Sequence, residues 1–296
     1  MVDGWIPWRN WSLTNGWGEP RRLANGSNLS YELRSTNGAI AITIGSRLAS
    51  WNGLSVGLGF VPQFINGRPY VHALDAAKNF QPLILPTLNL SRTNRVIVLD
   101  AGHGGENAGA KCVINGLYEK ELTLEWALRL EPLLSARGWK VCLSRTNDVD
   151  LTLPERVAFA DQIRADFFLS LHFNWVDPAA GGREQSGLET YCLTPRGMPS
   201  NLTREYEDDA SRVFPNNAFD AENLQYAVRL HRTLLEATGQ KDRGIRRARF
   251  MAVLREQNRP AVLLEGGYLS NPQEARLICS VAYRQKLAEA VAQALE

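Results

Sequence analysis

From residue 95 onward, short continuous apolar runs alternate with longer segments that have helical periodicity. The apolar runs predict strands that are buried on both faces, as parallel strands between two layers of helices are. These strands are expected at 95–100, 140–145, 166–174, 187–193 and 261–267. The periodic segments predict helices at 119–137, 152–164, 222–238, 272–278 and 281–295. This alternation predicts an α/β fold with a mixed, mostly parallel sheet and helices on both faces.

Three of these helices carry clear end signals. Thr152 and Glu155 have the spacing of a capping box, and Pro154 stands near the first helical position. Gly138 and Gly239 follow two of the periodic segments. Glycine commonly ends a helix because it adopts the left-handed backbone conformation without a steric penalty.

Residues 1–90 follow a different pattern, with short alternating runs at 30–36, 39–46 and 55–61. Asn-Gly pairs punctuate these runs, and Asn-Gly favours tight hairpin turns because both positions reach positive φ. The pairs are Asn15-Gly16, Asn25-Gly26, Asn37-Gly38, Asn52-Gly53 and Asn66-Gly67. We therefore expect a small β-rich N-terminal domain over 1–90, a proline-containing linker around 82–95, and a larger domain over 91–296.

Tryptophans are concentrated at the start of the chain. Trp5, Trp8, Trp11 and Trp17 are four of the eight tryptophans in the sequence. They fit two interpretations: they cover a small sheet, or they form a surface that stacks on sugars or docks a partner.

Composition narrows the function classes. The chain has 296 residues, and 33 Lys and Arg against 31 Asp and Glu leave a formal net charge of +2, so no global basic field points to nucleic acid. No apolar run of about 18 residues predicts a transmembrane helix. The four cysteines, Cys112, Cys142, Cys192 and Cys279, are expected to be free thiols in the core. The first residues lack the pattern of a signal peptide, which fits a cytoplasmic protein or a chain whose export signal has been removed.

Candidate catalytic side chains follow the predicted strands. His103 comes just after the strand at 95–100, His172 lies near the end of 166–174, and Glu265 lies near the end of 261–267. Glu119 opens the helix that follows the first of these loops. Because sites in α/β sheets lie beyond the carboxyl ends of the strands, we expect these two histidines and two glutamates to converge.

Such a group fits a hydrolytic zinc site. Two imidazoles and one carboxylate are a known catalytic ligand set that leaves a position for water, and a second glutamate could then move protons. The alternative is that the histidines are ordinary packing residues. A carboxylate after four apolar residues, as at Glu265, argues against this alternative because it is costly without a partner. His72 and His231 have no such neighbours and are expected to be structural.

Other chemistries fit less well. The glycine-rich segment after residue 100 fails the dinucleotide pattern at Asn107 and lacks the Gly-Lys-Ser/Thr ending of a phosphate loop. No nucleophile elbow of the Gly-x-Ser-x-Gly type occurs in the sequence. Cys112 and Cys192 lie outside the histidine-bearing motifs, so neither is favoured as a nucleophile.

Over about residues 95–296 the motifs together resemble those of zinc-dependent N-acetylmuramoyl-L-alanine amidases. They are LDAGHGGENAGA, GLYEKELTLEWA, RTNDVDLTLPERVAFAD, SLHFN, GLETYCL and PAVLLEGGYLSN. The resemblance implies a peptidoglycan hydrolase that cleaves the amide between N-acetylmuramic acid and the L-Ala of the stem peptide. It further implies Zn²⁺ held by His103, Glu119 and His172, Glu265 as catalytic acid and base, and a periplasmic or secreted location. Gly266 and Asp161 depart mildly from the family pattern.

Residues 38–85 separately resemble the N-terminal domain of some copper amine oxidases and cell-wall proteins. The resemblance implies no copper in this chain, and a wall-association or packing module is the expectation. For the larger domain, the alternatives to the amidase are a zinc carboxypeptidase or other peptidase on the same fold, and a non-catalytic peptidoglycan-binding protein.

The segment 194–221 is a 28-residue connection between a predicted strand and a predicted helix. Connections longer than about 12–15 residues are uncommon unless they are functional or disordered. Its acidic residues are Glu205, Glu207, Asp208 and Asp209. It is interpreted either as a surface loop, or as a lid or self-inhibitory segment over the metal site.

Overall fold

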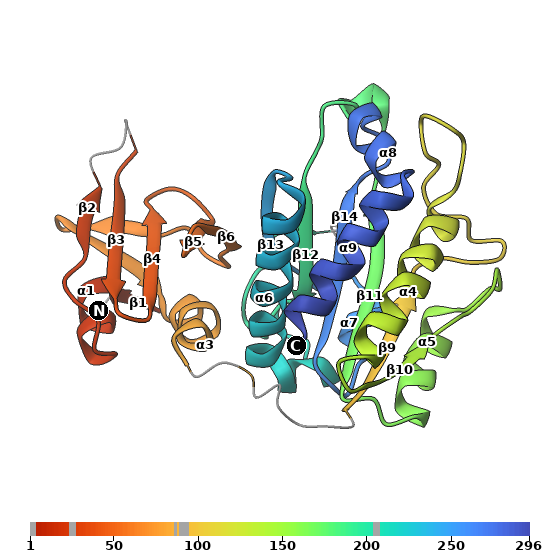
Figure 1. Cartoon of the computed structure of the whole chain (residues 1–296). Coiled ribbons are helices and arrows are strands. Elements are labelled where there is room, and N and C mark those ends of the chain that lie inside the picture. Colours follow the sequence, from red (N-terminus) through yellow and green to blue (C-terminus); the bar gives the residue numbers. More distant parts are fainter. Residues whose placement is uncertain (1–3, 24–27, 86–87, 89–94, 204–207) are drawn as a thin grey trace.

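The computed structural model describes residues 4–23, 28–85, 88, 95–203 and 208–296. Within these ranges the strands form one eleven-stranded sheet and one three-stranded sheet (Figure 1). The large sheet has the order β10 (Trp139–Leu143), β9 (Arg95–Ala101), β11 (Phe167–Asn174), β14 (Ala261–Tyr268), β12 (Leu188–Leu193), β13 (Asp242–Ala248), β6 (Leu54–Gly57), β5 (Leu48–Trp51), β4 (Gly38–Thr43), β3 (Ser30–Ser35) and β2 (Arg21–Leu23).

The predicted α/β architecture is confirmed. β9, β10, β11 and β14 run parallel, while β12 is antiparallel to β14, which makes the sheet mixed. β13, which runs parallel to β12, was not predicted. Its sequence DRGIRRA looks exposed because it is rich in charge. The structure instead buries Arg247, whose guanidinium donates to the backbone oxygens of Leu193 and Lys78.

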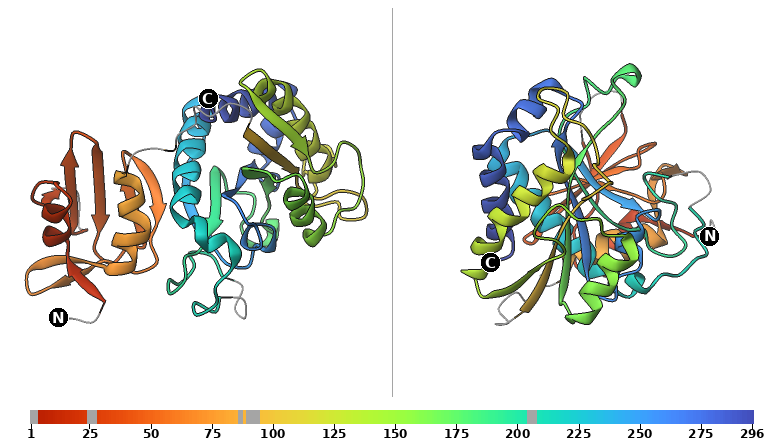
Figure 2. Two further views of the ribbon diagram at one scale, coloured as in Figure 1. Left: turned by 90° about the horizontal axis from the view of Figure 1, so that it is seen from below. Right: turned by 90° about the vertical axis from the view of Figure 1, so that its right-hand side faces the viewer.

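Helices cover both faces of this part of the sheet (Figure 2). One face carries α4 (Glu119–Ser135), α6 (Asp220–Thr238) and α9 (Val281–Ala294). The other face carries α5 (Leu153–Gln162) and α7 (Ala252–Arg255). α8 (Pro272–Ile278) follows β14. Alternate residues of the central strands therefore enter two cores, so that Phe167 and Leu169 of β11 pack on the first side and Phe168 on the second.

The structure contains the helix cap and the helix-ending glycines that the sequence predicts. At the start of α5 the Glu155 amide donates to Thr152 Oγ1 over 3.3 Å, and the Thr152 amide donates to Glu155 Oε2 over 2.7 Å. Gly138 and Gly239, after α4 and α6, have φ of +82° and +66°. A side chain at either position would strain this left-handed backbone.

The N-terminal region is β-rich, as predicted. Strands β2 to β6 form consecutive antiparallel pairs. A second sheet contains β1 (Trp5–Pro7), β8 (Arg68–His72) and β7 (Gln63–Ile65). Short helical segments complete the region: α1 (Trp8–Thr14), α2 (Ala73–Asp75), η1 (Ala76–Phe80) and α3 (Gln81–Ile84). Asn52-Gly53 and Asn66-Gly67 form the hairpin turns with positive φ at both positions, whereas Asn25-Gly26 lies outside the described residues.

The tryptophan cluster is mainly a packing feature. Trp8, Trp11 and Trp17 are buried in the larger hydrophobic core. Trp11 packs against Phe80, and Trp17 packs against Trp51. The sugar-stacking interpretation is therefore wrong for these three side chains, because their rings are covered by the protein itself.

The N-terminal strands join the rest of the molecule through the sheet. β6 pairs in parallel with β13, where Val56 lies opposite Ile245. Nearby, Arg47 donates to the backbone oxygens of Pro199 and Ser200, both over 3.0 Å. Most of the predicted linker, at 86–87 and 89–94, lies outside the described residues. The division of the chain near residue 90 stays a prediction.

None of the helices in the described ranges combines the length and apolar character needed to cross a membrane.

Candidate metal centre

Three of the four predicted site residues meet at the carboxyl end of the parallel strands. His103 follows β9, His172 lies in β11, and Glu119 is the first residue of α4. β9 and β11 are neighbours, with Ala101 opposite Leu171, so the ends of the two strands coincide. The fold thereby brings together ligands that are far apart in the sequence.

The ligand atoms are close enough to share one ion. His103 Nε2 lies 3.1 Å from Glu119 Oε2, and His172 Nδ1 lies 2.9 Å from Glu119 Oε1. One ligand atom from each residue can be chosen so that all three lie within 4.8 Å of one another. Tetrahedral zinc with bonds of about 2.0–2.1 Å places its ligands about 3.3 Å apart. The group could therefore hold a metal ion.

Hydrogen bonds outside the centre orient these ligands. His103 Nδ1 lies 2.8 Å from Asn107 Oδ1, so a proton on Nδ1 would leave Nε2 free to face an ion. Glu119 accepts from the amides of Ala110 and Phe173, both over 3.0 Å. Its place in the first turn of α4 also favours a negative charge.

Two glycines leave just enough room for the ligands. A Cβ on Gly102 would lie 2.3 Å from Cε1 of His172. A Cβ on Gly109 would lie 2.7 Å from Cδ2 of His103 and 2.8 Å from Glu119 Oε2, and the φ of Gly109 is +69°. All three contacts are shorter than 3.0 Å, so a side chain at either position would displace the ligands.

The charges of the three ligands reinforce one another. Burial alone would raise the pKa of Glu119, but hydrogen bonds and charge interactions with His103 and His172 outweigh it and hold the pKa well below its usual range. Burial lowers the pKa of His103, and its hydrogen bond and charge interaction with Glu119 overcome this and raise it. Glu119 is therefore ionised and ready to act as a ligand.

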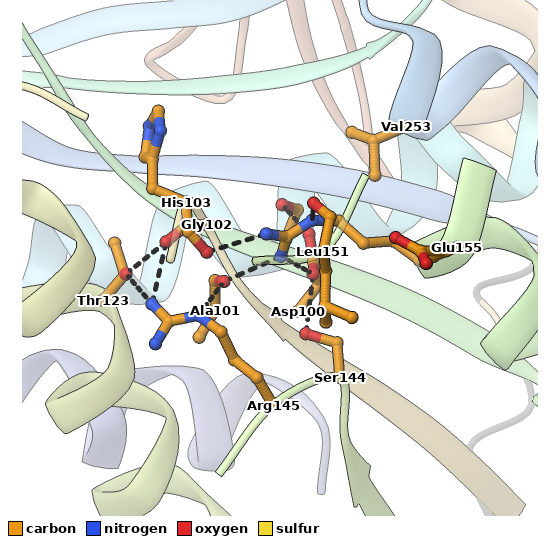
Figure 3. Close-up of polar contacts among 12 residues, drawn as sticks. Asp100, Ala101, Gly102, His103, Thr123, Ser144, Arg145, Leu151, Glu155 and Val253 are labelled. Atoms are coloured by element: carbon orange, nitrogen blue, oxygen red, sulfur yellow. Dashed lines mark hydrogen bonds and ion pairs between the residues drawn. The ribbon is translucent and has the colours of Figure 1, made fainter. Parts of the chain in front are cut away.

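Two buried arginines hold the backbone that carries His103, and Figure 3 shows one of them, Arg145, against Ala101 and Gly102. Arg145 donates to the carbonyl oxygens of Ala101 and Gly102, both over 3.0 Å. Arg156 donates to the carbonyl oxygens of Ala101 and His103, over 2.9 and 2.7 Å. This loop needs such support because His103 has an unusual φ of +64°.

Asp100 holds Arg156 in place. Its carboxylate accepts from Arg156 over 2.6 Å, from Ser144 over 2.7 Å and from Ser170 over 2.8 Å. Burial would raise the pKa of Asp100, but the charge of Arg156 and these hydrogen bonds hold it below its usual value. Sequence reasoning missed these positioning residues, although Asp100 shows the signal that singled out Glu265, a carboxylate at the end of an apolar strand.

Glu265 lies on β14 in register with His172 of the neighbouring strand. The side chain is partly accessible as a whole, but its Oε2 atom is buried and has no hydrogen-bond partner among the described residues. Burial, followed by the charges of Glu119 and Glu189, raises the pKa of Glu265 well above its usual value. A carboxyl group that binds a proton more tightly than an ordinary glutamate therefore stands beside the candidate metal group.

Glu189, on the other side of Glu265, is a further residue that sequence reasoning missed. It lies opposite Glu265 on β12 and accepts hydrogen bonds from Asn174, Tyr191, Tyr268 and Arg243. Its signal was present in the sequence as a carboxylate inside the apolar run GLETYCL.

The other two histidines are structural, as expected. The ring of His72 stacks on Phe60 with 3.6 Å between centroids. His231 is fully buried in α6 and contacts Thr190 and Asp242. Neither belongs to the candidate metal group.

The lid interpretation of 194–221 is wrong for its described residues. Because β12 is antiparallel to β14, the segment leaves the sheet at the end opposite the metal centre. Asn216 accordingly donates to the backbone oxygen of Arg259, before the start of β14 and about 20 Å along that strand from Glu265. Asp208 pairs with Arg249 at the same end, while Glu205 and Glu207 lie outside the described residues.

Comparison with known proteins identifies the family. Residues 97–296 match the family model described as N-acetylmuramoyl-L-alanine amidase. The chain belongs to this family. Its members are peptidoglycan hydrolases, which confirms the resemblance seen in the motifs.

Relatives and solved structures agree with this assignment. The chain is 34% identical to the amidase CwlM of Bacillus licheniformis over 67% of this chain and 66% of that protein. It is 30% identical to the amidase AmiA of Escherichia coli over 70% of this chain and 77% of AmiA. The solved catalytic domain of the amidase CwlV from Bacillus (Paenibacillus) polymyxa var. colistinus is 32% identical, with a TM-score of 0.54, over 68% of this chain and 95% of the domain.

Proposed function

We propose that this chain hydrolyses the amide bond between N-acetylmuramic acid and L-Ala in peptidoglycan, with a zinc ion bound by His103, Glu119 and His172. The observation that carries the proposal is the register of the sheet, which sets Glu265 directly beside the candidate ligand His172. A metal group and a carboxyl group whose Oε2 has no hydrogen-bond partner among the described residues can together activate water for the hydrolysis of an amide. Family membership supports the choice of bond.

The donor set favours zinc over the harder divalent ions. Two imidazoles and one carboxylate suit zinc, whereas magnesium and calcium prefer ligand sets made of oxygen. When bound, zinc would supply Lewis-acid polarisation of the scissile carbonyl and would lower the pKa of water at the site.

The residues of the chain divide the remaining tasks. Asn107 fixes the His103 ring, while the Ala110 and Phe173 amides fix the Glu119 carboxylate. Glu265 takes a proton from the attacking water and delivers a proton to the leaving L-Ala nitrogen. Its raised pKa suits this task, because a carboxylate that binds a proton more tightly than an ordinary glutamate is the stronger base and keeps the proton until the leaving nitrogen takes it.

A cavity of about 240 Å³ beside the metal centre is the proposed entrance for the substrate. Its lining includes His103, His172, Leu151, Leu153 and Val253. Polar groups at the ligands and apolar side chains opposite them fit a muramyl peptide, which combines polar amides with methyl-bearing lactyl and alanyl groups. Because the proposed substrate is cell-wall peptidoglycan, we also propose a periplasmic or secreted location.

Digestion of purified muropeptides, read by mass spectrometry, tests the proposal. The full chain is stripped with a chelator and reloaded with zinc. We expect release of the free stem peptide with L-Ala at its N-terminus, loss of activity after chelation, and recovery with zinc. Cleavage between stem-peptide residues would instead identify a peptidase. Binding of muropeptides without cleavage by the zinc-loaded chain would identify a non-catalytic binding protein.

A further inference from the structure

Two cysteines that are far apart in the sequence meet where the loop before α4 lies against the end of α8. The Sγ atoms of Cys112 and Cys279 lie 3.1 Å apart, although 167 positions separate the residues. This separation is only about 1 Å longer than a disulfide bond of about 2.05 Å. Cys112 lies in the loop between β9 and α4, and Cys279 directly follows α8.

Backbone hydrogen bonds hold both cysteines in place. The Cys112 amide donates to the oxygen of Leu117 over 2.8 Å, and the next residue, Val113, donates to Leu269 over 3.2 Å. The Cys279 amide donates to the oxygen of Ala275 over 2.9 Å. The loop and the region around α8 are thus already fastened to each other, so the two sulfur atoms meet through a fixed backbone arrangement.

We propose that Cys112 and Cys279 form a disulfide bond when the protein is in an oxidising environment. The oxidant would be a small-molecule or protein disulfide. The Cys279 thiolate attacks one sulfur of that disulfide and expels a thiolate, which leaves a mixed disulfide on Cys279. The Cys112 thiolate then displaces the second half of the oxidant. Two electrons and two protons pass from the cysteine pair to the oxidant, which leaves as two thiols.

The exposure of the two residues sets the order of these steps. Cys279 is half-buried and can be reached from solvent, whereas Cys112 is buried. Cys279 therefore reacts with the oxidant first. The buried Cys112 thiolate then attacks the mixed disulfide on Cys279.

The other two cysteines have no part in the bond. Cys142 lies in β10 and Cys192 in β12, and three strands separate these in the sheet. Cys192 Sγ instead lies 3.2 Å from Nη1 of Arg247. The oxidation should therefore yield one specific bridge.

The bridge would stabilise the loop that supports Glu119. The same loop contains Ala110, whose amide donates to Glu119 Oε2. Closing a ring this large restricts the unfolded chain, and we expect the oxidised protein to unfold about 5–10 °C above the reduced protein. Any change in metal affinity on oxidation would depend on the proposed function, because it assumes that Glu119 binds a metal ion. Formation of the disulfide bond does not depend on the proposed function.

The test is a mass-spectrometric map of the full chain. The protein is incubated with oxidised glutathione or with dithiothreitol, free thiols are alkylated in denaturant, and the chain is digested without reduction. We expect one cross-linked pair of peptides, joining Cys112 to Cys279, in the oxidised sample only. Cys279→Ser should abolish the cross-link and the shift in unfolding temperature, while the matched control Cys142→Ser should retain both.

Four alkylated cysteines after the oxidant, or bridges to Cys142 or Cys192, would overturn the proposal. Equal unfolding temperatures of the oxidised and reduced wild type would overturn the predicted stabilisation of the loop. The peptide map does not depend on hydrolysis, so its outcome is distinguishable from a failure of the amidase proposal.

Discussion

At the scale of single residues, Gly109 constrains two candidate metal ligands at once. A methyl group there would collide with His103 and with Glu119, and the backbone is left-handed. We expect Gly109→Ala to weaken zinc affinity at least tenfold, which metal titration of the purified variant would measure. Gly116→Ala is the matched control, because Gly116 has a similar φ of +75° in the same loop but its Cβ would meet no atom closer than 3.5 Å. Equal zinc affinities for the two variants would contradict the steric explanation.

Arg156 is expected to contribute strongly to stability through its buried ion pair with Asp100. Arg156→Met would leave Asp100 charged and buried without its partner, so we expect a loss of about 3–5 kcal/mol in the free energy of unfolding. Arg129→Met, which removes a partly exposed pair with Glu125, should cost about 0.5 kcal/mol. Denaturant titrations of both variants provide the comparison, and similar losses would argue against an essential role for the buried pair.

The ion pair between Arg156 and Asp100 also makes the free energy of unfolding depend on pH. The pKa of Asp100 is lowered in the folded state, so its stabilising contribution is fully present above the ordinary aspartate pKa of about 3.9 and is lost as pH falls through the lower folded value. The stability difference between wild type and Arg156→Met should therefore shrink on acidification below about pH 4. Unfolding titrations at several pH values would show this, and a difference that grows below pH 4 would have the wrong sign.

At the scale of secondary-structure elements, the helices and parallel strands of 95–296 could be predicted because local chemistry agreed with the tertiary structure. Continuous apolar runs became strands between two helix layers, and Thr152 capped α5 as its sequence pattern indicates. β13 could not be predicted, because its arginines find their partners only in the folded protein. The sequence also did not predict that β12 runs antiparallel to β14. This direction moves the 194–221 segment to the end of the sheet away from the metal centre.

The cap of α5 gives a prediction at this scale. Thr152→Ala removes the side-chain acceptor for the Glu155 amide and should lower the free energy of unfolding by about 1 kcal/mol. Thr233→Ala inside α6 is the control, because the Thr233 hydroxyl donates back to the carbonyl oxygen of Arg229 in the same helix and alanine favours the helix interior. Chemical denaturation would distinguish them, and an equal or larger loss in the control would contradict the capping argument.

At the scale of the whole molecule, the N-terminal strands extend the sheet of the amidase region. The CwlV catalytic domain, 95% of which is covered by this chain, shows that a related domain of this size forms a structure of its own. We therefore expect residues 95–296 alone to fold and to act on soluble muropeptides.

Loss of β6 would expose the edge of β13, so the truncated chain should also unfold at a lower temperature and self-associate more than the full chain. Light scattering and thermal unfolding would test this; a monomeric fragment of unchanged stability would show that the shared sheet contributes little.

The central claim is that Glu265 moves the proton at a metal centre made by His103, Glu119 and His172. The most direct measurement is the turnover of zinc-loaded Glu265→Gln on purified muropeptides, with zinc content measured on the same sample. Glutamine keeps the shape of the side chain but does not transfer protons, so we expect normal zinc content and a loss of about 10²–10⁴-fold in kcat. Glu289→Gln on the exposed side of α9 should keep full activity as a control. Turnover of zinc-loaded Glu265→Gln within a few-fold of wild type would contradict the claim.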